Sequence, residues 1–330
     1  MKKFIIIFLM SFCVMFYQCG NKNVKPQVLP QIEDKVNIIF DTDMGSDCDD
    51  AGALALLHQF ADEGMVNLLG VIFSSGINRY GIGVCDAINT YYGRGDIPLG
   101  QYAGQDVGDP KNYYSEQIAM DKTRFPHDVI DASEDMIAVY KRILREQPDK
   151  SVTILFVGHP HALYFLIHDT EGENLIKTKV QKCVFVESTG VKPSKGWNFC
   201  HNGVAPYISD ILTLCTVNMY FSSSGSATLT GHQLLPLMPE NNPVREAYRL
   251  FGNSLREGRP SWDPIAVMFA VQPQLFVIDS IGSLVQNEND EVYWDVTGEN
   301  PNHKKVTPIN SDEMGNIIEK MMAEKPKRKN

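Results

Sequence analysis

The sequence predicts an α/β domain with an open, mostly parallel sheet flanked by helices, Rossmann-like in its first half. Short apolar runs recur along the chain and are typical of strands buried on both faces. Segments with helical periodicity lie between these runs, which is the order expected of an α/β domain. Acidic residues gather directly after the first run, at a strand-to-helix turn, and open α/β sheets bind their ligands at such turns.

The elements can be assigned in chain order from these patterns. Strands are expected at 36–40, 66–73, 96–100, 151–157, 180–186 and 214–221. Helices are expected at 51–57, at 80–92, between a Ser133 cap and Pro148, and from Asn242 onward. The polar segment 101–130 is expected to cover the cleft, residues 290–310 to form a terminal hairpin, and the last ten residues to fray.

The N-terminal residues predict export. Lys2 and Lys3 precede an apolar run too short for a membrane span, so residues 1–19 are interpreted as a signal peptide. Its end resembles the lipobox of bacterial lipoproteins, with Cys19 as the lipidated residue; an ordinary signal peptide and an uncleaved anchor are the alternatives. Residues 20–34 are expected to be a tether and 35–330 the folded domain. We expect a periplasmic, outer-membrane or cell-surface lipoprotein that contacts the membrane only through its lipid.

Charge and cysteine content exclude several classes of protein. The net charge is −10, and removal of Lys2 and Lys3 changes it to −10 − 2 = −12, which argues against nucleic acid as a partner. Seven cysteines are present. Loss of Cys13 and acylation of Cys19 would leave an odd number without CxxC spacing, so a disulfide framework is disfavoured.

The stretch from Asp41 to Asp50 holds five carboxylates and no basic residue. Asp41 and Asp43 point the same way on an extended chain, whereas Asp49 and Asp50 fall at the start of a helix. A helix N-terminus stabilises an anion by only about 0.3–1 kcal/mol, which is too little to hold this cluster together. Either the acids extend into water, with Asp49 as an N-cap, or a cation joins them. Oxygen ligands favour Ca²⁺ or Mg²⁺ over zinc.

Two known acidic motifs do not fit this stretch. An EF-hand loop that began at Asp41 would need Gly and Glu where Ser46 and Gly52 stand. Phosphatases of the haloacid dehalogenase type normally have Thr or Val where this chain has Gly45.

The stretch Asp41–Ala51 resembles the signature Asp-x-Asp-x-Gly-x-Asp-Asp-Ala of the nucleoside hydrolase family, inosine-uridine-preferring type, in a form two residues longer. The resemblance extends over roughly 36–275 and implies the nucleoside hydrolase fold with a bound Ca²⁺. It also implies that the N-glycosidic bond of a ribonucleoside is hydrolysed to ribose and free base, by a Ca²⁺-bound water that a carboxylate base assists. Relatives are often homodimers or tetramers, so a homo-oligomer is one possible assembly, and the sequence itself leaves the oligomeric state open.

The resemblance also implies roles for individual residues. Asp43 would be the catalytic base and a Ca²⁺ ligand. Asp50, Asp263 and the carbonyl of Val157 would be the other ligands. Contacts to the substrate would come from Asp49 at the ribose 2′-hydroxyl, with Asp47 as the alternative because of the two extra residues, from Asn78 and Asn198 at the ribose, and from Trp262 at the base.

The chain departs from the family pattern at several positions. Gly196 stands where relatives have a ribose-binding Glu, for which Glu187 is a candidate substitute, and Trp262 stands where purine-protonating relatives have His. His159 and His161 would be a zinc-binding pair or, as we favour, two turn residues. A non-catalytic Ca²⁺-dependent nucleoside-binding lipoprotein that feeds a transporter is therefore the alternative function. Preference for purine or pyrimidine stays open.

Overall fold

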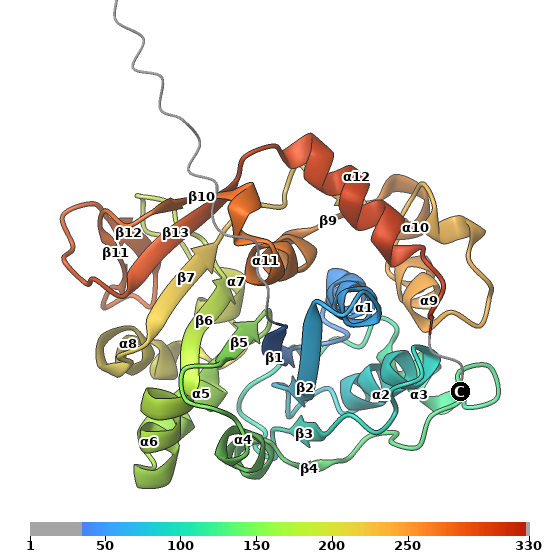
Figure 1. Cartoon of the computed structure of the whole chain (residues 1–330), viewed down its shortest axis with the longest axis horizontal. Coiled ribbons are helices and arrows are strands. Elements are labelled where there is room, and N and C mark those ends of the chain that lie inside the picture. Colours follow the sequence, from blue (N-terminus) through green and yellow to red (C-terminus); the bar gives the residue numbers. More distant parts are fainter. Residues whose placement is uncertain (1–34, 328–330) are drawn as a thin grey trace, which may run out of the picture. The chain divides into compact units, whose positions relative to one another are not determined.

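Strand β1 (Val36–Thr42) lies inside the central sheet of the computed structural model, which describes residues 35–327. Within these residues nine strands form one sheet in the order β10-β13-β7-β6-β5-β1-β2-β3-β4 (Figure 1). All neighbouring strands pair in parallel except β10 and β13, so the predicted mostly parallel α/β sheet is confirmed. The remaining strands of the sheet are β2 (Val66–Phe73), β3 (Leu99–Gln101), β4 (Glu134–Asp135), β5 (Val152–Phe156), β6 (Val180–Val186), β7 (Asn218–Ser222), β10 (Phe276–Asp279) and β13 (His303–Pro308).

Helices cover both faces of this sheet, and each face has its own hydrophobic core. Side chains alternate along β1, so Ile38 and Phe40 pack in one core and Ile39 in the other. The first core contains residues of α1 (Asp49–Asp62), α2 (Gly81–Tyr91), α3 (Ser115–Met120), α9 (Pro243–Leu250), α11 (Trp262–Val271) and α12 (Ser311–Met322). The second contains residues of α4 (Met136–Arg145), α5 (His161–Ile167), α6 (Thr170–Lys179), α7 (Trp197–Cys200) and α8 (Ala205–Leu214).

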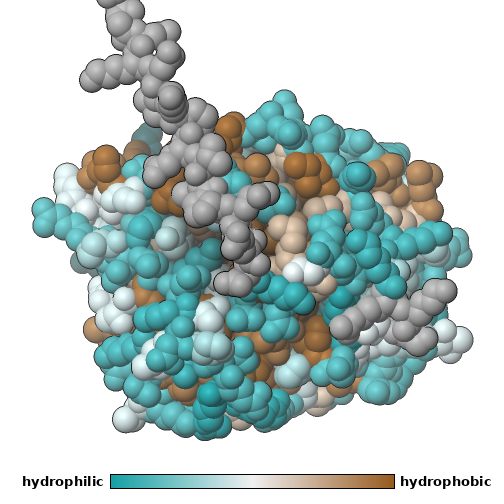
Figure 2. Space-filling model, in the orientation of Figure 1, coloured by the Kyte–Doolittle hydropathy of each residue, from teal (hydrophilic) through white to brown (hydrophobic). Residues whose placement is uncertain are grey.

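Short elements complete the described chain. Strands β8 (Leu229–Thr230) and β9 (Arg259–Pro260) form one two-stranded sheet, and β11 (Ser283–Gln286) and β12 (Val292–Asp295) form another. Helix α10 (Ser254–Glu257) precedes β9, and two 3₁₀ turns lie at Leu235–Leu237 and Pro273–Leu275. The visible face carries mostly hydrophilic residues with smaller hydrophobic patches between them (Figure 2).

Apart from the shifted ends of α1, expected at 51–57, and of β3, expected at 96–100, three expected boundaries differ from the structure. Helix α4 is capped by Asp135, whose Oδ1 accepts hydrogen bonds from the backbone N–H groups of Ile137 and Ala138, and not by Ser133. Leu214 ends α8, and β7 begins only at Asn218, because an apolar run alone does not distinguish the end of a helix from a strand.

The third difference concerns the C-terminal region. The hairpin is β11–β12, which ends at Asp295, whereas β13 joins the main sheet beside β7. Helix α12 then follows, and it includes two of the ten residues that were expected to fray.

The predicted signal peptide 1–19 with Cys19 and the tether 20–34 lie outside the described residues and stay predictions. Among residues 35–327, none of the helices combines the length and apolar character that a membrane crossing needs.

Candidate active site

The strand order places four candidate residues in one row. Strands β7, β6, β5 and β1 are neighbours, and Ser222, Glu187, Val157 and Asp43 lie at or just after their carboxyl ends. The chain extends the sheet from β1 through β2 to β4 and then returns to place β5 on the other side of β1. Ligands bind at such a switch point in open α/β sheets.

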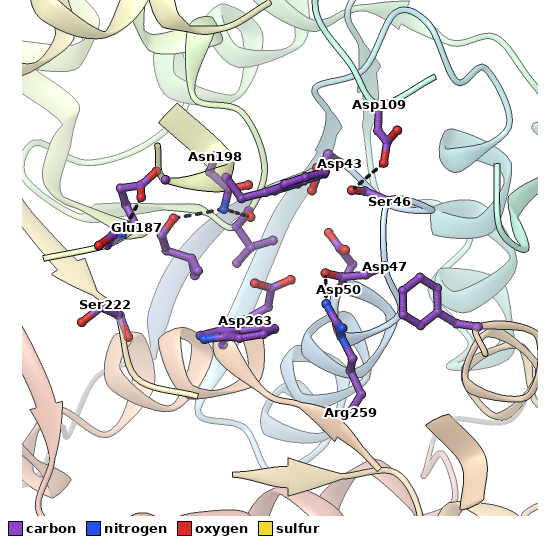
Figure 3. A pocket seen from close by; sticks show the side chains of 18 of the residues that line it. Asp43, Ser46, Asp47, Asp50, Asp109, Glu187, Asn198, Ser222, Arg259 and Asp263 are labelled. Atoms are coloured by element: carbon purple, nitrogen blue, oxygen red, sulfur yellow. Dashed lines mark hydrogen bonds and ion pairs between the residues drawn. The ribbon is translucent and has the colours of Figure 1, made fainter. Parts of the chain in front are cut away.

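A cavity of about 470 Å³ opens at this row (Figure 3). Two of its sides differ in chemistry. We call Asp43, Asp47, Asp50 and Asp263 the acidic wall, and Glu187, Asn198 and Ser222 the Glu187 wall. The cavity is also lined by Ser46, Asp109, Tyr113, Val157, Val186, Ser188, Gly196, Trp197, Ser223, Phe251, Arg259 and Trp262.

The turn between β1 and α1 shapes the acidic wall. Gly45 has φ +105°, and a Cβ there would lie 2.8 Å from Asn78 Nδ2 and 2.9 Å from Ser115 Oγ, so a glycine is needed. Tyr114 holds the turn in place: its hydroxyl accepts from Gly45 N (3.1 Å) and donates to the carbonyl of Asp47 (2.6 Å). The segment 101–130 thus contacts the acidic turn, and its Asp109 and Tyr113 line the cavity.

The carboxyl groups of the acidic wall are crowded and mostly buried. Burial, together with the charges of Asp47 and Asp109, raises the pKa of Asp43 to about 7. Burial and the charges of Asp43 and Asp47 raise the pKa of Asp50 well above its usual value. Burial and the charges of the neighbouring aspartates likewise raise the pKa of Asp263 well above its usual value. These shifts mean that the ionised wall is costly unless positive charge accompanies it.

Arg259 supplies one positive charge, which was missed in the sequence. Its Nη2 lies 2.5 Å from Asp47 Oδ2 and its Nε lies 3.4 Å from Asp49 Oδ1. The guanidinium carbon is 5.1 Å from the ring centroid of Phe251 and 5.1 Å from that of Trp262. Asp47 and Arg259 are 212 residues apart, so no local sequence pattern predicts their contact.

The carboxylate oxygens around the cavity fit a hard cation. Carboxylate oxygens of Asp47, Asp49 and Asp263 lie within 4.8 Å of one another. Among the described residues, Asp43 Oδ2 is buried without a hydrogen-bond partner. An all-oxygen donor set with an unpartnered carboxylate oxygen suits Ca²⁺ or Mg²⁺. Of the ligands implied by the resemblance, Asp43, Asp50, Asp263 and Val157 all line the cavity, and only Asp263 belongs also to the close trio.

Asp47, and not Asp49, faces the cavity. Asp49 is 1% exposed, and its Oδ2 accepts from Asp263 N at 3.3 Å, whereas its Oδ1 contacts Arg259. Asp263 lies in the first turn of α11, which begins at Trp262 and has Ser261 as its N-cap. Trp262 lines the cavity beside Arg259.

The Glu187 wall contains two buried oxygens without partners among the described residues, Glu187 Oε2 and Ser222 Oγ. The two residues are neighbours, since Glu187 N donates to the carbonyl of Ser222 at 3.0 Å. Burial raises the pKa of Glu187 to about 8, although its hydrogen bond from Ser188 N acts against the shift. Glu187 is therefore mostly a neutral carboxylic acid at pH 7.

The side chain of Glu187 fills the space that a side chain at 196 would need. A Cβ on Gly196 would lie 1.5 Å from Glu187 Oε1. The carboxyl group of Glu187, which follows β6, therefore lies where the side chain of a residue-196 glutamate would begin.

The two predicted asparagines have different surroundings. Asn198 Nδ2 donates to the carbonyls of Val157 (2.7 Å) and Val186 (3.0 Å), so only its side-chain oxygen is left for a ligand. Asn78 lies behind the acidic turn, where its Oδ1 accepts from Ser115 Oγ and Tyr80 N. It is not among the residues that line the cavity.

The two histidines do not form a metal pair. Burial lowers the pKa of His159 to about 4 and that of His161 to about 3, so both are neutral. His159 Nε2 lies 3.8 Å from Asp43 Oδ2, while His161 packs against the ring of Tyr102 with centroids 4.4 Å apart. Within residues 35–327 the close group of possible metal ligands consists of aspartates alone.

Comparison with known proteins supports one fold. No family model matches the sequence, and no curated protein sequence matches it. An inosine-uridine-preferring nucleoside hydrolase from Bacillus anthracis has 12% identity and a TM-score of 0.67, and the match covers 87% of this chain and 99% of the other. An inosine-guanosine nucleoside hydrolase has 14% identity and a TM-score of 0.67, with 87% and 98% covered. The type III effector XopQ, solved in complex with adenosine diphosphate ribose, has 13% identity and a TM-score of 0.60, with 89% and 94% covered. The chain therefore has the nucleoside hydrolase fold.

Proposed function

We propose that this protein hydrolyses the N-glycosidic bond of a ribonucleoside to ribose and free base with the help of Ca²⁺. The observation that supports this most is the convergence of Asp43, Asp50 and Asp263 at the switch point of a nucleoside hydrolase fold, where Asp43 Oδ2 has no hydrogen-bond partner in the described part of the chain. Asp43, Asp50, Asp263 and the carbonyl of Val157 would hold the ion. When bound, the ion would supply charge that offsets these carboxylates and would orient a water molecule.

The residues of the acidic wall have complementary tasks in this reaction. Asp43 accepts the proton of the attacking water as general base while the water oxygen bonds to C1′ of the ribose. The C1′–N bond breaks with its electrons going to the base, which takes up a proton from solvent. The transition state of glycosidic cleavage resembles an oxocarbenium ion, and a wall of carboxylates stabilises that positive charge. Asp47 faces the cavity and replaces Asp49 as our candidate for the ribose hydroxyls.

The remaining lining residues position the substrate. Trp262 stacks on the base, and because an indole does not titrate, it stabilises the base by contact and not by proton donation. Glu187, as a neutral acid, donates a hydrogen bond to a ribose oxygen from the place where a residue-196 side chain would lie.

A second candidate is binding of a ribosyl ligand without turnover. The complex of XopQ with adenosine diphosphate ribose and the absence of a carboxylate at Gly196 itself favour it. Among residues 35–327, however, Arg259 is the sole basic side chain that lines the cavity and could meet a diphosphate, and two carboxylates already hold this guanidinium.

One experiment separates the two candidates. The purified protein is incubated with a panel of purine and pyrimidine nucleosides, with calcium or with a chelator, and free base is quantified by chromatography. Calorimetric titrations with the same nucleosides and with adenosine diphosphate ribose run in parallel. Calcium-dependent release of base supports the hydrolase, whereas tight binding without release of any base from the panel contradicts it and supports the binder.

A further inference from the structure

Arg259 occupies a central position in the acidic wall that the proposed reaction does not use. Its guanidinium bridges Asp47 and Asp49, which are two of the three carboxylates that lie within 4.8 Å of one another. The third, Asp263, is tied to the same group because its backbone N–H donates to Asp49 Oδ2 at 3.3 Å. The protein therefore carries its own cation in the same cavity wall as Asp43, Asp50 and Asp263, which would hold the added ion.

The position of this guanidinium is fixed from several sides. The backbone of Arg259 pairs with Thr230 in the β8–β9 sheet, which holds the base of the side chain. The rings of Phe251 and Trp262 lie on the guanidinium at 5.1 Å each, a distance at which the ring electrons attract a cation. An arginine is always protonated, so its charge stays in the cavity wall at every physiological pH.

We propose that Arg259 is the built-in counter-ion of Asp47 and Asp49, and that a divalent cation binds the acidic wall in competition with this guanidinium. The inference rests on the proposed function, since the cation is the one that the hydrolase requires. The guanidinium neutralises part of the carboxylate charge that would attract the ion and repels the ion directly. Both effects weaken ion binding, and the first also stabilises the ion-free protein.

The competition predicts opposite effects of one substitution on two measured quantities. Arg259→Met keeps an apolar stem between the two rings and removes the charge. In a chelator, this variant melts at a lower temperature than the parent, because Asp47 and Asp49 lose their partner. With calcium, its melting temperature rises by more than that of the parent, because a ligand that binds the folded state more tightly stabilises it more. Calorimetry gives a calcium affinity on the order of tenfold higher than in the parent.

Two further variants isolate the charge of Arg259. Arg256→Met is the matched control: it removes the same charge three residues away, from a side chain that is 78% exposed and pairs with Glu257. It leaves the calcium affinity and the calcium-induced shift unchanged. Arg259→Lys keeps a charge without the planar fork and stays closer to the parent than Arg259→Met.

Each outcome separates the counter-ion from the calcium site itself. Suppose calcium raises the melting temperature of the parent, and raises that of Arg259→Met by the same amount or less. This result overturns the competition and leaves the hydrolase proposal in place. Failure of Arg259→Met to fold both with chelator and with calcium also overturns it, since the ion then does not replace the guanidinium. If calcium changes the melting temperature of neither the parent nor Arg259→Met, this result contradicts the ion site and the competition together.

Discussion

The acidic wall and the Glu187 wall both bury carboxyl groups, but they differ in what surrounds each group. In the acidic wall, Asp43, Asp50 and Asp263 share one side of the cavity, and Arg259 pairs with Asp47 of the same wall. In the Glu187 wall, one carboxyl stands beside hydroxyl, amide and apolar groups, and its neighbour Ser222 Oγ has no hydrogen-bond partner among the described residues.

The difference shows two ways to bury an acid. A single carboxyl can lower the cost of burial by keeping its proton, as the raised pKa of Glu187 indicates. A cluster can instead attract a cation, and a protein that needs carboxylates for catalysis gains from the second way because its acids stay ionised. The cavity would thus offer a substrate an anionic side and a neutral hydrogen-bonding side.

The largest expected effect lies in the acidic wall. Asp43→Asn keeps the shape of the side chain and removes the base, so kcat/KM for the preferred nucleoside should fall about 10²–10⁴-fold. Steady-state release of base measures the loss, and Asp96→Asn, at an exposed aspartate, is the control with no change. If Asp43→Asn is nearly as active as the parent, Asp43 is not the general base, and the reaction does not need this carboxylate in its ionised form.

The second prediction concerns the protonation of Glu187. Its pKa is raised to about 8 in the folded protein from 4.5. The unfolded chain therefore releases this proton at lower pH than the folded one, and the contribution of Glu187 to stability falls as pH rises from about 5 to about 8. Glu187→Gln removes this dependence, so the parent should lose stability relative to the variant across that window, by at most about 5 kcal/mol.

Urea denaturation across the pH range measures this difference. Other groups titrate in the same window, among them Asp43, but they are common to both proteins and cancel when the two curves are subtracted. Glu299→Gln, at an exposed glutamate, is the matched control for the loss of one carboxyl group. A flat difference for Glu187→Gln would show that the second wall is ionised like the first.

The sequence predicts the acidic wall better than the Glu187 wall, for a physical reason. Asp43 and Asp50 lie on either side of one short turn between an apolar strand and a helix, so periodicity and spacing suffice to place them at the ligand-binding edge. The apolar strands of the sheet were likewise visible, since buried parallel strands are nearly continuous hydrophobic runs.

The contact that was missed joins distant segments. Arg259 reaches Asp47 across 212 residues, and such a contact leaves no periodic trace in the sequence. Glu187 was named as a candidate substitute for the carboxylate absent at Gly196, but only the structure shows that its side chain fills the space beside Gly196. Helix α12 was missed as well, and its buried Glu319 accepts hydrogen bonds from the backbone of Gly231 and Gln233, another contact that only the folded chain reveals.

The smallest expected effect tests the exchange of a side chain at 196 for Glu187. Gly196→Ala places a Cβ against the carboxyl of Glu187, and because the site is closely packed, the variant should lose about 1–3 kcal/mol of stability and bind nucleoside more weakly. Gly190→Ala is the matched control in the same loop, where the nearest atom to a new Cβ is 3.8 Å away. In a Glu187→Ala background the cost of Gly196→Ala should disappear, since the two changes then no longer compete for one space. Equal costs in both backgrounds would mean that in solution Glu187 does not occupy the space of a side chain at residue 196. The arrangement of the Glu187 wall would then need another explanation.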